Sequence, residues 1–303
     1  MGGMAAMQAS RSPPLARRES QPHQKGSAMR RYPAALTVIG ILLIGLPWLL
    51  RSNPVVAWLA SFGLMTLFVL VAGRAVTGQW LGALIDERNV VSLSRFQMAL
   101  WTGLLLSAFF CAAMLNLAQG DSEALKIAVA PELWALMGIS ATSLVASPLI
   151  LTTKAEKPPN EAEAQNSLVL LDRKEETPGN ADHVGQLVVN RDIKNARWSD
   201  LFTGEEVGNA THLDLTRIQM FFFTIVTAVT YGGLVVQKFW TFGSDGINEL
   251  PNLHASMVAL LGISHTGYLA AKAVPHSRDA NDPASMRPAA PAPDLLSDQP
   301  PLG

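Results

Sequence analysis

Residues 93–117 read LSRFQMALWTGLLLSAFFCAAMLNL, and this stretch decides the fold. From Phe96 to Leu117 the run carries no charged residue, and its length is close to the ~20 residues with which a helix crosses ~30 Å of hydrocarbon. Five further apolar runs resemble it, at residues 33–50, 55–71, 131–151, 218–239 and 253–274. Their only charged residues lie close to the run ends: Glu132, Lys238 and Lys272. The pattern predicts an all-α membrane protein with six transmembrane helices.

The composition agrees with a membrane protein and excludes several other classes. Hydrophobic residues make up 49% of the chain and charged residues only 16%, against about 25% charged in an average soluble domain. The alternative, buried helices of a large soluble protein, rarely gives six such runs with charge confined to their ends. A net charge of -1 provides no basic field for nucleic acid. The single Cys111 permits neither an internal disulfide nor the usual zinc spacings, so we expect no metal and no cofactor.

The distribution of basic residues predicts the orientation. If the N-terminus lies inside, 20 of the 23 Lys and Arg residues fall on the inner side, and only Arg51, Lys126 and Lys238 fall outside. The positive-inside rule therefore predicts a multi-pass protein of the bacterial inner (cell) membrane with both termini cytoplasmic and the lipid bilayer as its surroundings. A cleaved signal peptide is the competing interpretation of residues 33–50, but a long basic region precedes them and no A-x-A site follows closely.

An internal duplication organises the chain. LSRFQM at 93–98 matches LTRIQM at 215–220, and ALMGISATSLVA at 135–146 matches ALLGISHTGYLA at 259–270 in 7 of 12 positions. The match predicts two two-helix repeats with the same topology, unlike the inverted repeats of many transporters. The predicted units are a disordered basic tail (1–31), a transmembrane hairpin (33–76), repeat 1 (84–152), a cytoplasmic insert (153–204), repeat 2 (205–274) and a second disordered tail (275–303).

The insert is predicted to be a small α+β unit. Residues 154–166 have the composition of a charged linker, and 167–173 (SLVLLDR) and 184–191 (VGQLVVNR) are typical of short strands joined by a turn at 176–183. Residues 198–209 (WSDLFTGEEVGN) are expected to form a short amphipathic element against the inner membrane surface.

Small residues recur at helical spacing in both repeats. They are Gly138, Thr142 and Ala146 in the first copy, and Gly262, Thr266 and Ala270 in the second. Such stripes let helix backbones approach closely in lipid, so we expect these six positions to serve helix packing.

Seven polar residues are the candidates for contact with a ligand: Arg95, Gln97, Arg217, Gln219, Ser140, Ser264 and His265. The arginines start two spans and can reach phosphates at the membrane surface, and the acidic pairs 86–87 and 205–206 could pair with them. A glutamine inside an apolar run must find a hydrogen-bond partner, and a bond between helices is favoured over ligand binding. The serines can instead form hydrogen bonds within their own helix. His265 stands alone among apolar neighbours, so a proton or ligand role is the less favoured interpretation.

No catalytic signature is present, because P-loop, H-E-x-x-H and G-x-S-x-G motifs and paired intramembrane carboxylates are all missing. The sequence thus favours a non-enzymatic sensor or scaffold, with residues 153–215 as the contact surface for a cytoplasmic protein. The alternative is a small channel or carrier whose polar path follows the repeat axis. Such a protein could act as a homo-oligomer. That path would use Gln97, Gln219, Ser140, Ser264 and His265.

Overall fold

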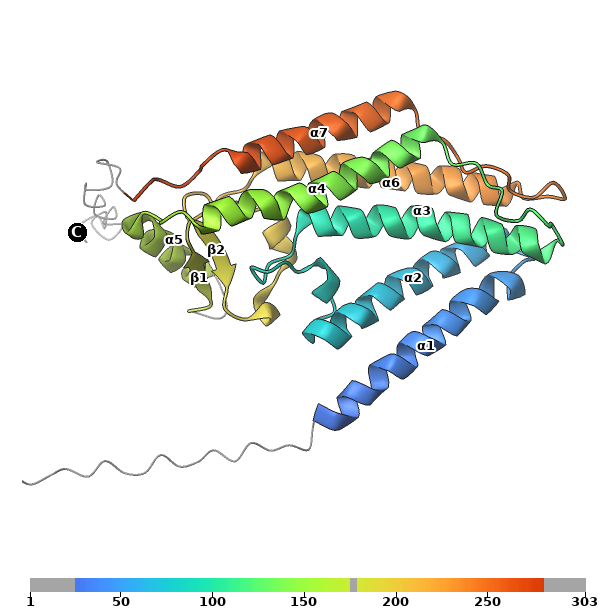
Figure 1. Cartoon of the computed structure of the whole chain (residues 1–303), viewed down its shortest axis with the longest axis horizontal. Coiled ribbons are helices and arrows are strands. Elements are labelled where there is room, and N and C mark those ends of the chain that lie inside the picture. Colours follow the sequence, from blue (N-terminus) through green and yellow to red (C-terminus); the bar gives the residue numbers. More distant parts are fainter. Residues whose placement is uncertain (1–24, 175–178, 281–303) are drawn as a thin grey trace, which may run out of the picture.

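The computed structural model describes residues 25–174 and 179–280, and it is mostly helical. Six long helices run alternately toward and away from a small lobe at one end of the bundle (Figure 1). They are α1 (Lys25–Leu49), α2 (Pro54–Thr77), α3 (Leu93–Ala118), α4 (Pro131–Ala155), α6 (Leu215–Trp240) and α7 (Ala255–Ala273). The expectations for residues 1–24 and 281–303 lie outside the described residues.

Five of these helices, rather than the expected six, are long and apolar enough to cross a membrane. The qualifying helices are α1, α2, α3, α4 and α6. Helix α7 has 19 residues, but His265 and Lys272 lie among them together with several small polar residues, which lowers its hydropathy. The five apolar helices indicate a multi-pass membrane protein, whereas a sixth crossing stays a prediction.

Local signals set the helix boundaries. Asn53 begins α2 by accepting a hydrogen bond from the Val56 amide, with Pro54 in the first helical position where no amide is needed. Gly78 ends the same helix with φ of 77°, a left-handed conformation that glycine adopts without strain. Asp214 begins α6 by accepting from the amides of Thr216 and Arg217.

Trp58 joins three helices at the core of the bundle. Its ring on α2 stacks on Phe239 of α6 with centroids 6.1 Å apart, and its Nε1 donates to Ser107 Oγ of α3 at 3.2 Å. The side chain is only 3% exposed. The same core contains the other large buried residues, among them Trp101, Leu115, Leu133, Leu136, Tyr231 and Leu261.

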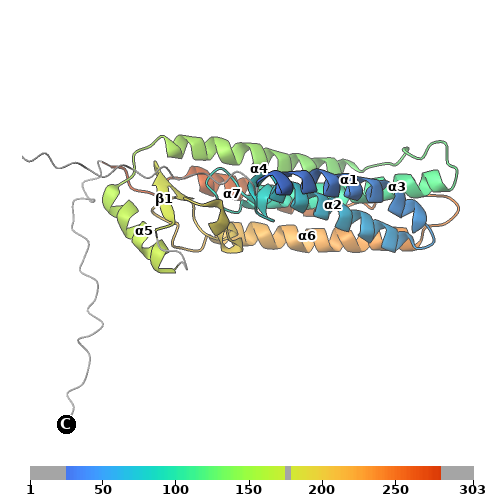
Figure 2. The same ribbon diagram turned by 90° about the horizontal axis from the view of Figure 1, so that it is seen from below.

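The lobe contains α5 (Glu161–Lys174), an antiparallel pair β1 (Ala181–Val184) and β2 (Leu187–Asn190), and two 3₁₀ turns, η2 (Ile193–Asn195) and η3 (Trp198–Leu201). Figure 2 shows α5 and β1 projecting beyond the ends of the long helices. The η3 turn packs inward, with Leu201 buried against the bundle and Trp198 edge-on to Phe96 of α3.

Three expectations for the insert are wrong. Residues 181–184 form β1 although they fall mostly in the predicted turn at 176–183, and β2 covers only Leu187–Asn190 of the predicted strand 184–191. Residues 167–173 form the second half of α5 and not a strand, and residues 154–166 are no linker, since they end α4 and begin α5. The Asn160 side chain accepts from the Glu163 amide at 3.1 Å at the helix start. Ala164 and Ser167 are buried, and Leu168 and Leu171 are half-buried, at the i, i+3, i+4, i+7 spacing of a helix face.

Parts of both predicted disordered tails are ordered. Residues 25–31 belong to α1. At the other end, residues 275–280 lie against the lobe: the amides of His276 and Ser277 donate to the Glu206 carboxylate, and Asp279 forms a bridge with Pro159. Hydrogen bonds to a buried carboxylate thus order a segment whose composition alone indicates disorder.

We expect Trp58→Ala to lower the free energy of unfolding by about 3–5 kcal/mol, because it opens a cavity where three helices meet. Trp134→Ala is the matched control, since this α4 ring is 65% exposed and its loss should cost roughly 0.5 kcal/mol. Denaturant titration of the purified protein in detergent measures both. Equal losses for the two variants would contradict the packing role of Trp58.

Candidate functional site

Two consecutive carboxylates, Glu205 and Glu206, are buried where the lobe meets the bundle, with exposures of 9% and 2%. Their backbone runs beside β2, because Glu205 O accepts from the Val188 amide at 2.9 Å and the Val207 amide donates to Gln186 O at 2.9 Å. Successive side chains of such an extended segment point to opposite sides. The two carboxylates therefore meet different partners.

Glu205 gathers three cations from three parts of the chain. Its Oε1 lies 2.5 Å from Arg217 Nη2 at the start of α6, 2.8 Å from Arg88 Nη2 in the α2–α3 connection and 2.9 Å from Lys272 Nζ near the end of α7. Burial raises the pKa of Glu205, but the three positive charges outweigh it and hold this pKa well below its usual range. Glu205 is consequently charged at neutral pH.

Glu206 binds the end of α4 and the segment after α7. Its Oε1 lies 2.5 Å from Lys154 Nζ, and its Oε2 accepts from the amides of His276 at 2.9 Å and Ser277 at 3.0 Å. Lys154 Nζ also donates to the Val274 carbonyl at 2.9 Å and to the Lys272 carbonyl. Burial raises the pKa of Glu206, yet these donors bring it below the ordinary value.

Arg88 links this cluster to the α2–α3 connection. It forms a second ion pair with Asp86 at 2.8 Å, and its backbone carbonyl accepts from the Asn190 amide of β2 at 2.9 Å. Burial lowers the pKa of Arg88, but Glu205 and Asp86 more than compensate and raise it. Near α7, Lys272 Nζ lies 4.8 Å from the centre of the Tyr268 ring and donates to Ser147 Oγ of α4. We call Asp86, Arg88, Lys154, Glu205, Glu206, Arg217 and Lys272 the junction cluster.

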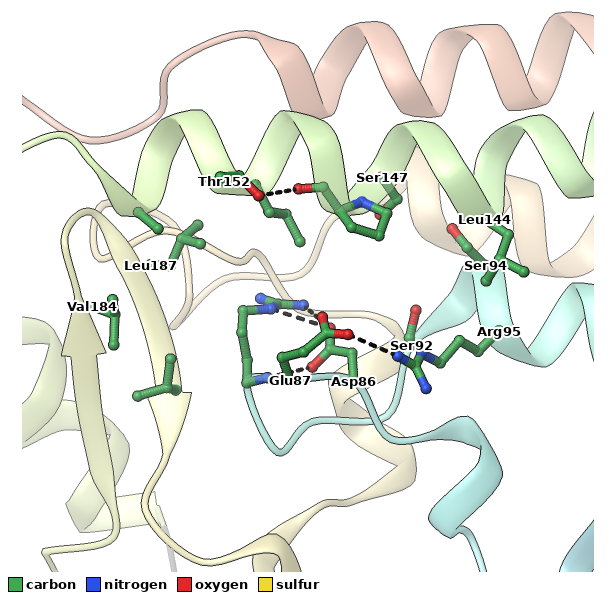
Figure 3. Close-up of a pocket in the computed structure, with 15 residues that line it drawn as sticks. Asp86, Glu87, Ser92, Ser94, Arg95, Leu144, Ser147, Thr152, Val184 and Leu187 are labelled. Carbon is green, nitrogen blue, oxygen red and sulfur yellow. Dashed lines mark hydrogen bonds and ion pairs between the residues drawn. The ribbon is translucent and has the colours of Figure 1, made fainter. Parts of the chain in front are cut away.

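The two predicted acid–arginine pairs are confirmed, but they are not equivalent. Arg217 pairs with Glu205 inside the junction cluster and its side chain is 4% exposed. Arg95 pairs with Glu87 at 3.1 Å, with side chains 33% and 77% exposed. Beside Arg95 and Glu87 lies a cavity of about 230 Å³ between α4, the α2–α3 connection, the start of α3 and the β1–β2 hairpin, which we call the interface cavity (Figure 3).

The two matched glutamines also differ. Gln97 is fully buried and its Nε2 donates to Thr224 Oγ1 at 2.6 Å, the bond between α3 and α6 that an amide in an apolar run requires. Gln219 is exposed on the outside of α6. The expected polar path cannot include Gln219 within one chain, because only one of the two glutamines faces the interior.

The remaining polar candidates lie between α4 and α7. His265 Nδ1 is 2.6 Å from Ser143 Oγ, a partner that the sequence analysis did not identify. His265 Nε2, Ser140 Oγ and Ser264 Oγ are buried and have no hydrogen-bond partner within residues 25–174 and 179–280. These three atoms are the polar groups of the α4–α7 contact that stay unsatisfied.

Four of the six expected packing positions face outward and do not pack helices together within one chain, whereas a Cβ at Gly262 would lie 3.5 Å from Ile139 Cδ1 of α4. Gly138, Thr142, Thr266 and Ala270 are exposed, and Ala146 and Gly262 are half-buried. Four of the six line an open groove along α4 and α7: Gly138, Thr142, Gly262 and Thr266. The buried α4–α7 surfaces instead carry Leu136, Ser140, Ser143 and Ser147 on α4, and Leu261, Ser264, His265 and Tyr268 on α7.

Sequence reasoning missed the role of Lys154 and Lys272. Lys154 falls in the segment predicted to be a charged linker, and Lys272 falls near the end of an apolar run, so neither was expected to form a buried ion pair. The sequence signal that could have found them is the acidic pair 205–206. The insert is too small to bury two carboxylates without cations from the bundle. Among the described residues no group of three or more His, Cys, Asp and Glu side chains could hold a metal ion.

We expect Glu205→Gln to destabilise the attachment of the lobe by about 3–5 kcal/mol, because three buried cations lose their common partner. Glu87→Gln is the control: the same change at a 77% exposed carboxylate should cost less than about 1 kcal/mol. Amide hydrogen exchange of residues 181–190 measures the difference. Unchanged protection in Glu205→Gln would show that the cluster does not hold the lobe.

Comparison with known proteins indicates no specific activity. No model of a protein family matches the chain, and neither does any curated protein or solved structure. The structural findings are several apolar helices, indicating a membrane protein, and a buried junction between them and a small lobe.

Proposed function

We propose that this protein is a non-enzymatic sensor or scaffold of the bacterial inner membrane. In this proposal α7 is a sixth crossing, both termini and the lobe are cytoplasmic, and the lobe is the contact surface for another protein. The distribution of Lys and Arg supports the orientation, since the lobe end carries most of them.

The observation that carries the proposal is the junction cluster. Its charges come from the connection after α2, the end of α4, the start of α6 and the end of α7. A shift of any of these elements breaks an ion pair in a buried, low-dielectric site, which costs several kcal/mol. The lobe therefore follows the arrangement of the helices, as a sensor or a positioned scaffold requires.

The lobe also offers a surface to a partner. Val169 and Leu170 on α5 and Val184 on β1 are 49%, 45% and 53% exposed, and α5 packs beside β1. Large apolar side chains exposed on a small charged lobe are available for contact with a protein.

Photo-crosslinking in cells that express the chain natively tests this function. A benzophenone amino acid at Leu170 should give a discrete adduct with another protein, and the same label at Leu125, 73% exposed at the far end of the bundle, should not. Glu205→Gln should reduce the Leu170 adduct several-fold because the lobe is released, whereas Glu87→Gln should leave it unchanged. The absence of any adduct from both Leu170 and Val184 would refute the contact surface.

A channel is the second candidate, and one observation favours it. Seven buried polar atoms of the long helices have no hydrogen-bond partner in the described part of the chain: Gln97 Oε1, Trp101 Nε1, Ser140 Oγ, Thr227 Oγ1, Tyr231 OH, Ser264 Oγ and His265 Nε2. Buried polar groups usually have partners, and water or an ion in transit could supply them.

Ion flux through liposomes separates the two candidates. For the sensor or scaffold we expect no flux above that of protein-free liposomes. Flux that falls with Gln97→Ala but persists with Gln219→Ala would establish a channel instead, because only Gln97 faces the interior. The two changes are chemically identical, so any effect of glutamine loss on insertion into the membrane is controlled.

A further inference from the structure

The interface cavity has two unlike walls, which Figure 3 shows facing each other across the hollow. One wall is charged and polar and comes from the α2–α3 connection and the start of α3. The other is mainly apolar and comes from α4 and the β1–β2 hairpin, with Ser147 and Thr152 of α4 as its polar members. The cavity volume of about 230 Å³ far exceeds the roughly 10–15 Å³ that one water molecule needs.

The charged wall has unused hydrogen-bonding capacity. Arg95 lines the cavity and uses one of its five N–H donors on Glu87, and the pair is partly exposed. Ser92 lines it too, and its hydroxyl does not cap α3 although it occupies the capping position. Arg95 and Ser92 can donate to a phosphate, and the carboxylate of Glu87 can accept from a group with N–H donors.

The apolar wall leads into the transmembrane part of the bundle. Leu144, Pro148 and Leu151 of α4 line the cavity, and Val145 and Leu149 of the same segment are 63% and 65% exposed on the outside. A molecule with its polar group in the cavity could therefore lay a hydrocarbon chain along α4 without exposing it to water.

We propose that the interface cavity binds the headgroup of a zwitterionic aminophospholipid, with the phosphate on Arg95 and Ser92 and the primary ammonium on Glu87. Charge-assisted hydrogen bonds supply the recognition of both ends. A choline headgroup has no N–H donor for Glu87, so phosphoethanolamine is the selected chemistry. A soluble phosphoethanolamine carries the same groups, but it leaves the apolar wall uncovered.

Native mass spectrometry of the full chain tests the selection directly. Purified protein is mixed with equal amounts of phosphatidylethanolamine and phosphatidylcholine of identical acyl chains. We expect one retained lipid, with ethanolamine over choline by about tenfold, the factor that one charge-assisted hydrogen bond gives. Equal retention of the two lipids overturns the proposal, and this measurement needs no variant.

Three variants assign the contacts. Arg95→Gln should lower retention of phosphatidylethanolamine about tenfold, and Glu87→Leu, which removes the acceptor, should bring the ratio of the two lipids close to one while retention continues. Arg74→Gln is the control, because Arg74 lies at the same end of the bundle over the Trp80 ring and does not line the cavity. Loss of retention in Arg74→Gln equal to that in Arg95→Gln overturns the assignment.

A competition arm identifies the source of the headgroup. Soluble phosphoethanolamine, at the concentration of the lipid, should leave the bound lipid in place, because it gains nothing from the apolar wall. Displacement of the lipid by the soluble compound overturns the lipid assignment and makes the cavity a site for a soluble phosphate ester.

Discussion

The buried charge of Glu205 is the constraint on which the lobe end of the bundle depends. Taking a carboxylate out of water costs several kcal/mol, and only close cations compensate. Arg88, Arg217 and Lys272 come from separate elements, so the ion pairs form only when those elements are all in place. A hydrophobic contact would tolerate sliding, whereas three cations on one oxygen do not. The cluster thus contributes a defined arrangement more than it contributes net stability.

The long helices could be predicted because the length and apolar composition of each run are local properties of the sequence. The same holds for the Glu87–Arg95 and Glu205–Arg217 pairs, whose members are close in sequence. Lys154 and Lys272 could not be placed, because the ion pairs that bury them depend on the relative positions of α4, α7 and the lobe. A short apolar run such as SLVLLDR fits a strand or a helix equally well, and it is the start at Asn160 that decides for α5.

The duplicated motifs show what sequence similarity leaves open. Gln97 and Gln219 occupy matching positions, yet one bonds Thr224 inside the bundle and the other faces outward. The two matching arginines differ in the same way, because Arg95 lies at the surface and Arg217 is buried in the junction cluster. A short connection precedes α3 and the whole lobe precedes α6, so matching residues meet different neighbours. The small-residue stripes likewise remain available on the outside of α4 and α7.

The extended course of residues 205–207 beside β2 has a consequence for how this chain can change in evolution. Neighbouring carboxylates that bind different cations fix the count of residues between the hairpin and α6. Adding or removing one residue would bring Gly204 into the position of Glu205 or Val207 into the position of Glu206, so one set of buried cations would lose its carboxylate. Substitutions can accumulate in this segment one at a time, but insertions and deletions cannot. Related chains should therefore vary here in composition while keeping the spacing from Leu187 to Arg217 unchanged.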